Sequence, residues 1–109
     1  MDLTALEQQI LLVIMRLHPI AYGISIQDEL KARAGKEVAF GTIYACLDRL
    51  EDKGFVERRQ GEATPQRGGR RKLHYTLTAT GQRTLQASLN ALGALQRGIR
   101  WTEATNVIG

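Results

Sequence analysis

The chain has 109 residues, of which 43% are hydrophobic and 24% charged, and 15 basic residues against 11 acidic ones give a formal net charge of +4. This length fits one small domain, and this composition excludes a disordered, collagen-like or low-complexity chain. The longest apolar run is far shorter than a membrane span, and Met1 to Thr4 lack the features of a secretory signal. The single cysteine, Cys46, has no partner for an internal disulfide. We therefore expect a cytoplasmic protein without membrane association.

The first predicted helix covers residues 4–17. It begins with a capping box, in which Thr4 and Glu7 each satisfy a free backbone N–H, and it ends before Pro19. Apolar residues at helical spacing define one buried face: Leu3, Leu6, Ile10, Val13, Ile14 and Leu17. Leu11, Leu12 and Met15 extend the apolar surface to the other side. We therefore expect both faces of this helix to contact protein.

Two further helices follow at residues 23–34 and 40–53, ended by Gly35 and Gly54. The third helix has a core stripe made of Ile43, Cys46, Leu47 and Leu50. Its opposite face carries small and polar side chains, namely Thr42, Tyr44, Ala45, Asp48 and Arg49. Cys46 is interpreted as a buried apolar residue, because it belongs to the core stripe.

After Gly54 the apolar period changes, and residues 55–59 and 73–77 are predicted to form two short strands. The connection between them is rich in Gly and Arg, which predicts a hairpin with a long basic tip. Residues 58–72 contain six basic residues and one acidic residue, a charge of +5, whereas the rest of the chain sums to −1. The basic excess is therefore local, as in a segment that binds a polyanion.

The last predicted helix covers residues 79–101 and is capped by Thr78. Its apolar residues repeat at steps of three and four, close to a heptad: Leu85, Leu89, Leu92, Leu95 and Ile99. The helix is longer than a core this small can cover, so the exposed part of the seam needs a partner. We divide the chain into residues 1–77, a DNA-binding unit, and residues 78–109, a dimerisation helix and tail.

No catalytic or metal site is expected. His18 and His74 have none of the spacings of a zinc site, and no pair of carboxylates is placed for acid–base chemistry. The Gly68-Gly69 pair neither follows a strand nor opens a helix, so it is not a phosphate-binding loop. We therefore expect no enzyme activity and no cofactor.

The predicted fold class is mainly α with a small β-hairpin, in the order of a winged helix-turn-helix with a long C-terminal helix. In that fold the third helix enters the major groove of double-stranded DNA and the hairpin, or wing, reaches the backbone. Gly41 and Thr42 would approach phosphates, Tyr44 offers a hydroxyl, and Arg49 can contact phosphate or guanine. Asp48 weakens this face, so the affinity is expected to depend on the wing.

The ordered motifs of the chain resemble the PadR family of transcriptional regulators. They comprise Tyr22-Gly23, Gly41-Thr42-Ile43-Tyr44, Lys53-Gly54-Phe55-Val56 and Gly69-Arg70-Arg71-Lys72, followed by Tyr75, Leu77, Thr78 and Gly81. The resemblance covers residues 6–85 and implies a homodimeric repressor that pairs through its last and first helices. The predicted DNA-binding residues are Tyr22, Gly41, Thr42, Tyr44, Ala45, Arg49, Arg67, Arg70, Arg71 and Lys72. The predicted dimerisation residues are Leu6, Ile10, Leu85, Leu89, Leu92, Leu95 and Ile99.

Several residues have two interpretations. Tyr22 and Tyr44 either contact DNA or only pack helices together, and the basic run is either a DNA contact or a solvated loop. Trp101 is either an anchor of the dimer interface or a stacking surface for an inducer. The resemblance implies the second interpretation, because some PadR-like dimers bind flat aromatic or cationic compounds between their first and last helices. The sequence thus predicts a cytoplasmic dimeric repressor of an inverted-repeat operator, with a protein-interaction module as the alternative.

Overall fold

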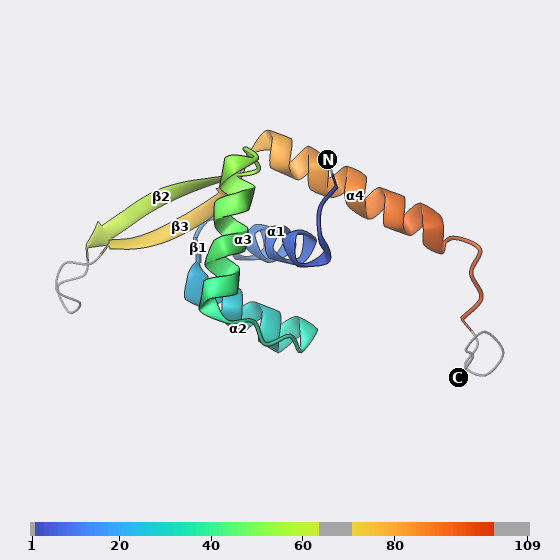
Figure 1. The fold of residues 1–109 in the computed structure, drawn as a ribbon, viewed down its shortest axis with the longest axis horizontal. Helices are drawn as coiled ribbons and strands as arrows, with labels where there is room; N and C mark the ends of the chain where they lie inside the picture. Colours follow the sequence, from blue (N-terminus) through green and yellow to red (C-terminus); the bar gives the residue numbers. More distant parts are fainter. Residues whose placement is uncertain (1, 64–70, 102–109) are drawn as a thin grey trace.

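A computed structural model describes residues 2–63 and 71–101 of the chain. Four helices and three strands follow one another along the sequence (Figure 1). They are α1 (Ala5–Leu17), β1 (Ala21–Tyr22), α2 (Gly23–Ala34), α3 (Phe40–Asp52), β2 (Val56–Ala63), β3 (Arg71–Leu77) and α4 (Ala79–Gln96). The predicted order of three helices, a hairpin and a last helix is confirmed. Within the described ranges, no helix has both the length and the hydropathy to span a bilayer.

Helix α1 begins with the predicted capping box. The Thr4 N–H donates to Oε1 of Glu7 (2.8 Å), and the Glu7 N–H donates to Oγ1 of Thr4 (3.1 Å). Ile10, Leu11 and Ile14 are buried in the core, so Leu11 contacts its own domain. The outer face of α1 carries Leu12 and Met15, which are 38% and 44% exposed.

The sheet has three antiparallel strands in the order β1-β3-β2, one more than the predicted hairpin. Strand β1 pairs Ala21 with Tyr75 and Tyr22 with His74. Two residues are too few to show a period of two, so the sequence pattern could not indicate this strand. Strands β2 and β3 are also longer than predicted, because their pairing continues to Ala63 and Arg71 past a register shift.

The core lies between α1, α2, α3 and the inner face of the sheet. The predicted stripe of α3 is confirmed, since Ile43, Cys46, Leu47 and Leu50 are fully buried. Burial raises the pKa of the Cys46 thiol, so the thiol stays protonated. Cys46 is therefore an apolar core residue, as predicted. Tyr75 extends this core beneath the sheet and is 2% exposed.

Helix α4 packs on the domain as far as Leu89, and its remaining turns project away from the domain (Figure 1). Thr78 caps it as predicted, accepting from the Gly81 N–H (3.0 Å). The helix ends at Gln96 and not at residue 101, because Arg97 is extended and Gly98 has a φ of +84°. The expectation that Ile99 and Trp101 lie on this helix is therefore wrong.

Gly81 allows the first turn of α4 to meet the turn before β2. A Cβ at this position would lie 2.8 Å from the carbonyl carbon of Phe55, whereas a Cβ at Gly93 on the same helix would meet nothing within 4 Å. We expect Gly81→Ala to lower the free energy of unfolding by about 2–4 kcal/mol through backbone overpacking. Gly93→Ala should leave it unchanged or raise it by up to about 1 kcal/mol. Urea denaturation of both variants tests this, and equal stabilities would contradict it.

Candidate nucleic-acid interface

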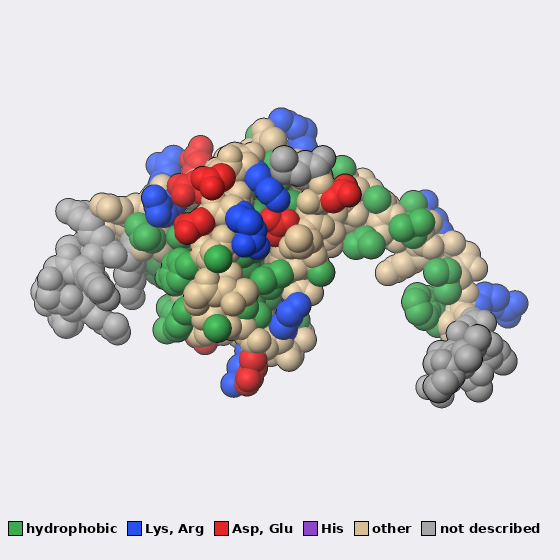
Figure 2. Space-filling view, in the orientation of Figure 1, with side chains coloured by type: hydrophobic (Ala, Val, Ile, Leu, Met, Phe, Trp, Pro, Cys, Tyr) green, Lys and Arg blue, Asp and Glu red, His purple; other side chains and the backbone are tan. Residues whose placement is uncertain are grey.

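The exposed face of α3 has two halves of different character. Thr42 and Ala45 lie exposed near its N-terminal end, and Asp48, Arg49 and Asp52 lie exposed toward its C-terminal end. Figure 2 shows hydrophobic side chains gathered beside the N-terminal end of α3 and charged side chains around its C-terminal end. The predicted positions Thr42, Ala45 and Arg49 thus share one face of the helix, as their spacing requires.

The start of α3 has no side-chain cap. Gly41 lies in its first turn and is exposed. The N-cap residue, Ala39, makes no side-chain hydrogen bond to the helix, and the first turn contains no acidic residue. Such a helix end is suited to an anion, because the unpaired N–H groups and the helix dipole favour negative charge.

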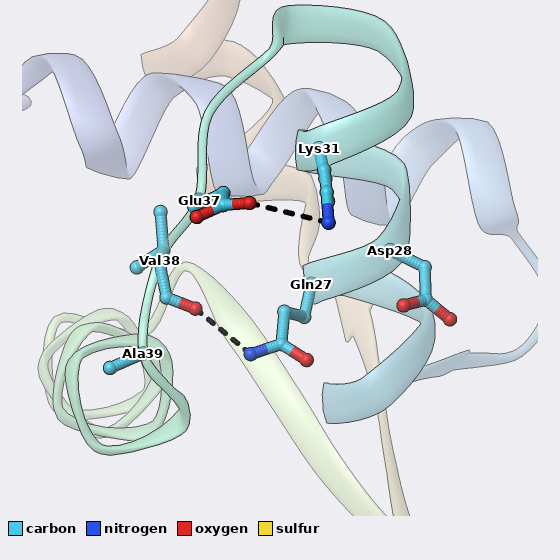
Figure 3. Close-up of a pocket in the computed structure, with 6 residues that line it drawn as sticks. All are labelled: Gln27, Asp28, Lys31, Glu37, Val38 and Ala39. Carbon is cyan, nitrogen blue, oxygen red and sulfur yellow. Dashed lines mark hydrogen bonds and ion pairs between the residues drawn. The ribbon is translucent and has the colours of Figure 1, made fainter.

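The connection between α2 and α3 is held by side chains of α2 (Figure 3). The Gln27 side-chain amide donates to the Val38 carbonyl (2.9 Å), and Lys31 forms an ion pair with Glu37 (3.3 Å). These residues line a pocket of about 400 Å³ beside Ala39. The contacts fix the direction in which α3 leaves the turn.

Tyr44 packs α3 against α2 and is also partly exposed to solvent. Its ring packs against the start of α2, where a Cβ on Gly23 would lie only 2.6 Å from Cζ of Tyr44. The side chain is nevertheless 39% exposed, and its ring lies 6.3 Å from that of Phe40. The residue that packs the two helices together is therefore also part of the exposed face.

Tyr22 directly precedes Gly23 and is the N-cap residue of α2. It is half-buried in β1 and its ring lies 6.2 Å from that of His74 on β3. Its backbone N–H donates to the Ser25 hydroxyl (2.9 Å), which fixes the first turn of α2. Tyr22 is therefore part of the junction between sheet and helix.

A buried carboxylate on α1 binds the two cationic side chains at the C-terminal end of α3. Glu7 is 1% exposed, Lys53 Nζ donates to its Oε2 (2.9 Å), and Arg49 Nε lies 3.8 Å from the same oxygen. Arg49 remains about half exposed but is directed toward α1. The sequence analysis missed this cluster, because Glu7 and Lys53 are separated by 46 residues.

The environment of Glu7 favours its charged form. Burial by itself raises the pKa of this carboxyl, but the hydrogen bonds from the Thr4 N–H and from Lys53, together with the charge of Lys53, outweigh burial and place the pKa below its ordinary value of 4.5. A depressed pKa means that Glu7 stabilises the fold above its unfolded-state pKa and loses this effect as the pH falls through the folded-state pKa.

We expect Glu7→Gln to lower the free energy of unfolding by about 2 kcal/mol at pH 7, because a charged hydrogen-bond acceptor is lost while Lys53 stays in place. The difference from the parent should shrink as the pH falls below about 4, where the unfolded parent takes up a proton at Glu7, and should vanish below the lowered folded-state pKa. Urea denaturation at pH 7, 5 and 3 measures it, with the exposed Glu57→Gln as the control. A deficit that is constant over this range would contradict the assignment.

The wing consists of β2, β3 and their connection. At its base, Arg58 lies 3.6 Å from Glu51 and Arg59 lies 3.4 Å from Glu57, so these two cations are neutralised locally. The predicted contacts Arg67 and Arg70 lie outside the described residues. Arg71 is the first residue of β3, and Lys72 follows it in that strand. The other basic residues of the predicted basic segment, at positions 67–72, stay a prediction of the sequence.

The predicted dimerisation residues fall into three groups by burial. Ile10 and Leu85 are enclosed by their own chain, at 0% and 2% exposure, so we assign them to the core and not to an interface. Leu6 and Leu89 are half-buried and pack against that core. The exposed members are Leu92 (45%), Leu95 (75%) and Ile99 (49%), and Trp101 beyond them is 80% exposed.

No group of three or more potential metal ligands occurs within residues 2–63 and 71–101.

Comparison with known proteins decides the family. The model of the transcriptional regulator PadR-like family matches residues 10–87, which is more than half of the chain. The chain belongs to this PadR-like family. This confirms the resemblance predicted from the motifs. The protein is a DNA-binding transcriptional regulator with a winged helix-turn-helix fold, and its family is not one of enzymes. The comparison with curated proteins gives no match.

Several solved structures share the fold. A PadR-like transcription factor from Bacteroides fragilis is 28% identical with a TM-score of 0.72, the alignment covering 84% of this chain and 82% of that one. A complex of hsRosR-SG is 31% identical with a TM-score of 0.68 and coverages of 90% and 80%. Bacillus subtilis PadR in complex with operator DNA is 23% identical with a TM-score of 0.68, and its match covers 97% of this chain and 54% of that one.

Proposed function

We propose that this PadR-like chain is a dimeric repressor that binds an inverted-repeat operator. The observation that carries the proposal is the N-terminal end of α3, which has no side-chain cap and exposes Thr42 and Ala45, and which the basic wing segment follows in the sequence. Bacillus subtilis PadR, which has the same fold, has been solved with operator DNA. Base contacts would come from α3, and backbone contacts from the wing.

The dimer would form through the outer half of α4 and the outer face of α1. Leu92 and Leu95 are exposed on a helix that leaves its own domain, and Leu12 and Met15 are exposed on α1. A soluble chain gains stability when such apolar surfaces are covered by a second copy. Two-fold symmetry would place the half-sites about one helical turn, or ~34 Å, apart.

Selection of binding sites from random double-stranded DNA tests the proposal, followed by gel shift and sedimentation. We expect inverted-repeat sequences to be enriched, and the free protein to sediment as a dimer. Enrichment of no sequence, together with a monomer that pairs only with another protein, would instead support the protein-interaction module. A rise in transcription from the selected promoter when the gene for this protein is deleted would establish repression.

We infer that an aromatic or cationic inducer would bind between α1 and α4 of the dimer. The support is the 80% exposure of Trp101, the only tryptophan of the chain, beyond the end of α4. A flat ligand stacked on this ring would quench its fluorescence. Quenching that occurs at the concentrations that release operator DNA would support an inducer, and unchanged emission over a panel of such compounds would favour the dimer-anchor interpretation.

A further inference from the structure

The first two turns of α3 present an apolar surface where a recognition helix contacts base edges. Phe40 and Tyr44 are 41% and 39% exposed, and Thr42 and Ala45 lie exposed beside them. Ile24, which follows Gly23 at the point where α2 touches Tyr44, is 56% exposed. Methyl groups and ring carbons therefore form much of the surface at this end of the helix.

The same two turns lack the side chains that usually distinguish bases by paired hydrogen bonds. Helix α3, all of which the structure describes, contains no Asn, Gln or Lys, and its single Arg is Arg49 in the third turn. Arg49 is directed toward the buried carboxylate of Glu7. Bidentate contacts of Arg with guanine, or of Asn and Gln with adenine, are thus unavailable near the helix start.

The base feature that matches an apolar helix surface is the C5-methyl group of thymine, which projects into the major groove and is contacted by Ala, Phe and the Thr methyl. We propose that the N-terminal half of α3 selects its operator half-site through thymine methyl groups, an inference that rests on the function proposed above. Thr42 and Ala45 supply the methyl surface, and Phe40 and Tyr44 extend the apolar surface beside it. Each contacted methyl group leaves water, which contributes to affinity without any hydrogen bond.

Uracil substitution tests this proposal directly, because deoxyuridine differs from thymidine only by the C5-methyl group. Once an operator has been selected, each thymine is replaced in turn and the dissociation constant is measured by gel shift. We expect at least one thymine in each half-site at which replacement weakens binding about fourfold, the effect of one methyl-sized group leaving water. Thymines in the spacer between the half-sites should tolerate the replacement.

Variants of α3 assign the effect to named side chains. In Thr42→Ser the hydroxyl stays and the methyl group is lost, and in Ala45→Gly the only side-chain carbon is lost. At the sensitive thymine, one of these variants should bind the thymine and uracil operators with equal affinity. The effects of the protein substitution and of the uracil replacement on the binding free energy would then be non-additive in a double-mutant cycle. Ala32→Gly, at an exposed position of α2, carries the same helix penalty and should preserve the parent's discrimination.

The outcomes separate the two proposals. If no DNA sequence is selected at all, the proposed function fails. If an operator is selected and bound tightly but uracil is tolerated at every position, the function stands and methyl recognition is overturned. Uracil sensitivity that persists unchanged in both Thr42→Ser and Ala45→Gly would equally overturn the assignment to α3.

Discussion

Replacement of Arg70, Arg71 and Lys72 by alanine is expected to weaken binding to every DNA sequence and to reduce its dependence on salt. Each phosphate contact by a basic side chain releases counterions, and the slope of log K against log salt changes by about 0.9 per contact. A dimer that loses three contacts from each wing should show a slope smaller by about 5. At low salt the affinity should fall on the order of a thousandfold.

The measurement is a salt titration of operator and non-operator DNA with parent and variant proteins. Both affinities should fall together, because phosphate contacts carry no sequence information. The matched control is Arg83→Ala, Arg97→Ala and Arg100→Ala, which removes three positive charges from α4 and the residues after it. Equal losses in the two triple variants would attribute the effect to net charge, and an unchanged slope in the wing variant would contradict the wing assignment.

The internal ion pairs explain why the wing is expected to dominate the affinity. Lys53 and Arg49, at the C-terminal end of α3, both face the carboxylate of Glu7. Arg58 is likewise paired with Glu51 at the base of the wing. The cations nearest α3 therefore stabilise the fold, and we expect contacts with phosphates to come from the basic residues of positions 67–72. Backbone contact and base recognition would thus come from different segments.

Local patterns in the sequence were sufficient to predict the helices. The Thr4–Glu7 capping box and the three-and-four spacing of Ile43, Cys46, Leu47 and Leu50 each depend on residues close in the chain, and both are confirmed. The glycine at position 35 also ends α2 as predicted, with a φ of +62°. These features are encoded within one or two helical turns, where propensity and capping act.

The errors arose where the pattern was misleading or the contact was distant. Ile99 continues the heptad of α4, but Gly98 has a left-handed backbone and the helix has already ended, so the periodicity suggested five residues too many. Strand β1 is defined only by its pairing with β3, which is more than 50 residues away. The link between Glu7 and Lys53 is also a tertiary contact with no local signal. Of the predicted site residues, those on α3 were placed on one face by helical spacing alone.

The dimer proposal leads to the second large effect, which concerns Leu92 and Leu95. Leu92→Asp combined with Leu95→Asp should leave the fold of residues 5–77 intact, because neither side chain belongs to the core of its own chain. In a dimer the two substitutions would place four carboxylates against apolar surface. Burial of each leucine is worth about 1.5–3 kcal/mol, so the dimer dissociation constant should rise at least a thousandfold.

Sedimentation equilibrium should then show a monomer, and gel shift should show loss of the high-affinity complex, since a single α3 and a single wing cover only one half-site. Asn90→Asp adds one carboxylate per chain at an exposed position of α4 and should remain dimeric. A double variant that stays dimeric would exclude the outer half of α4 as the interface. A monomer that still binds the full operator with parental affinity would instead remove the need for a dimer, because half-site contacts alone would then account for recognition.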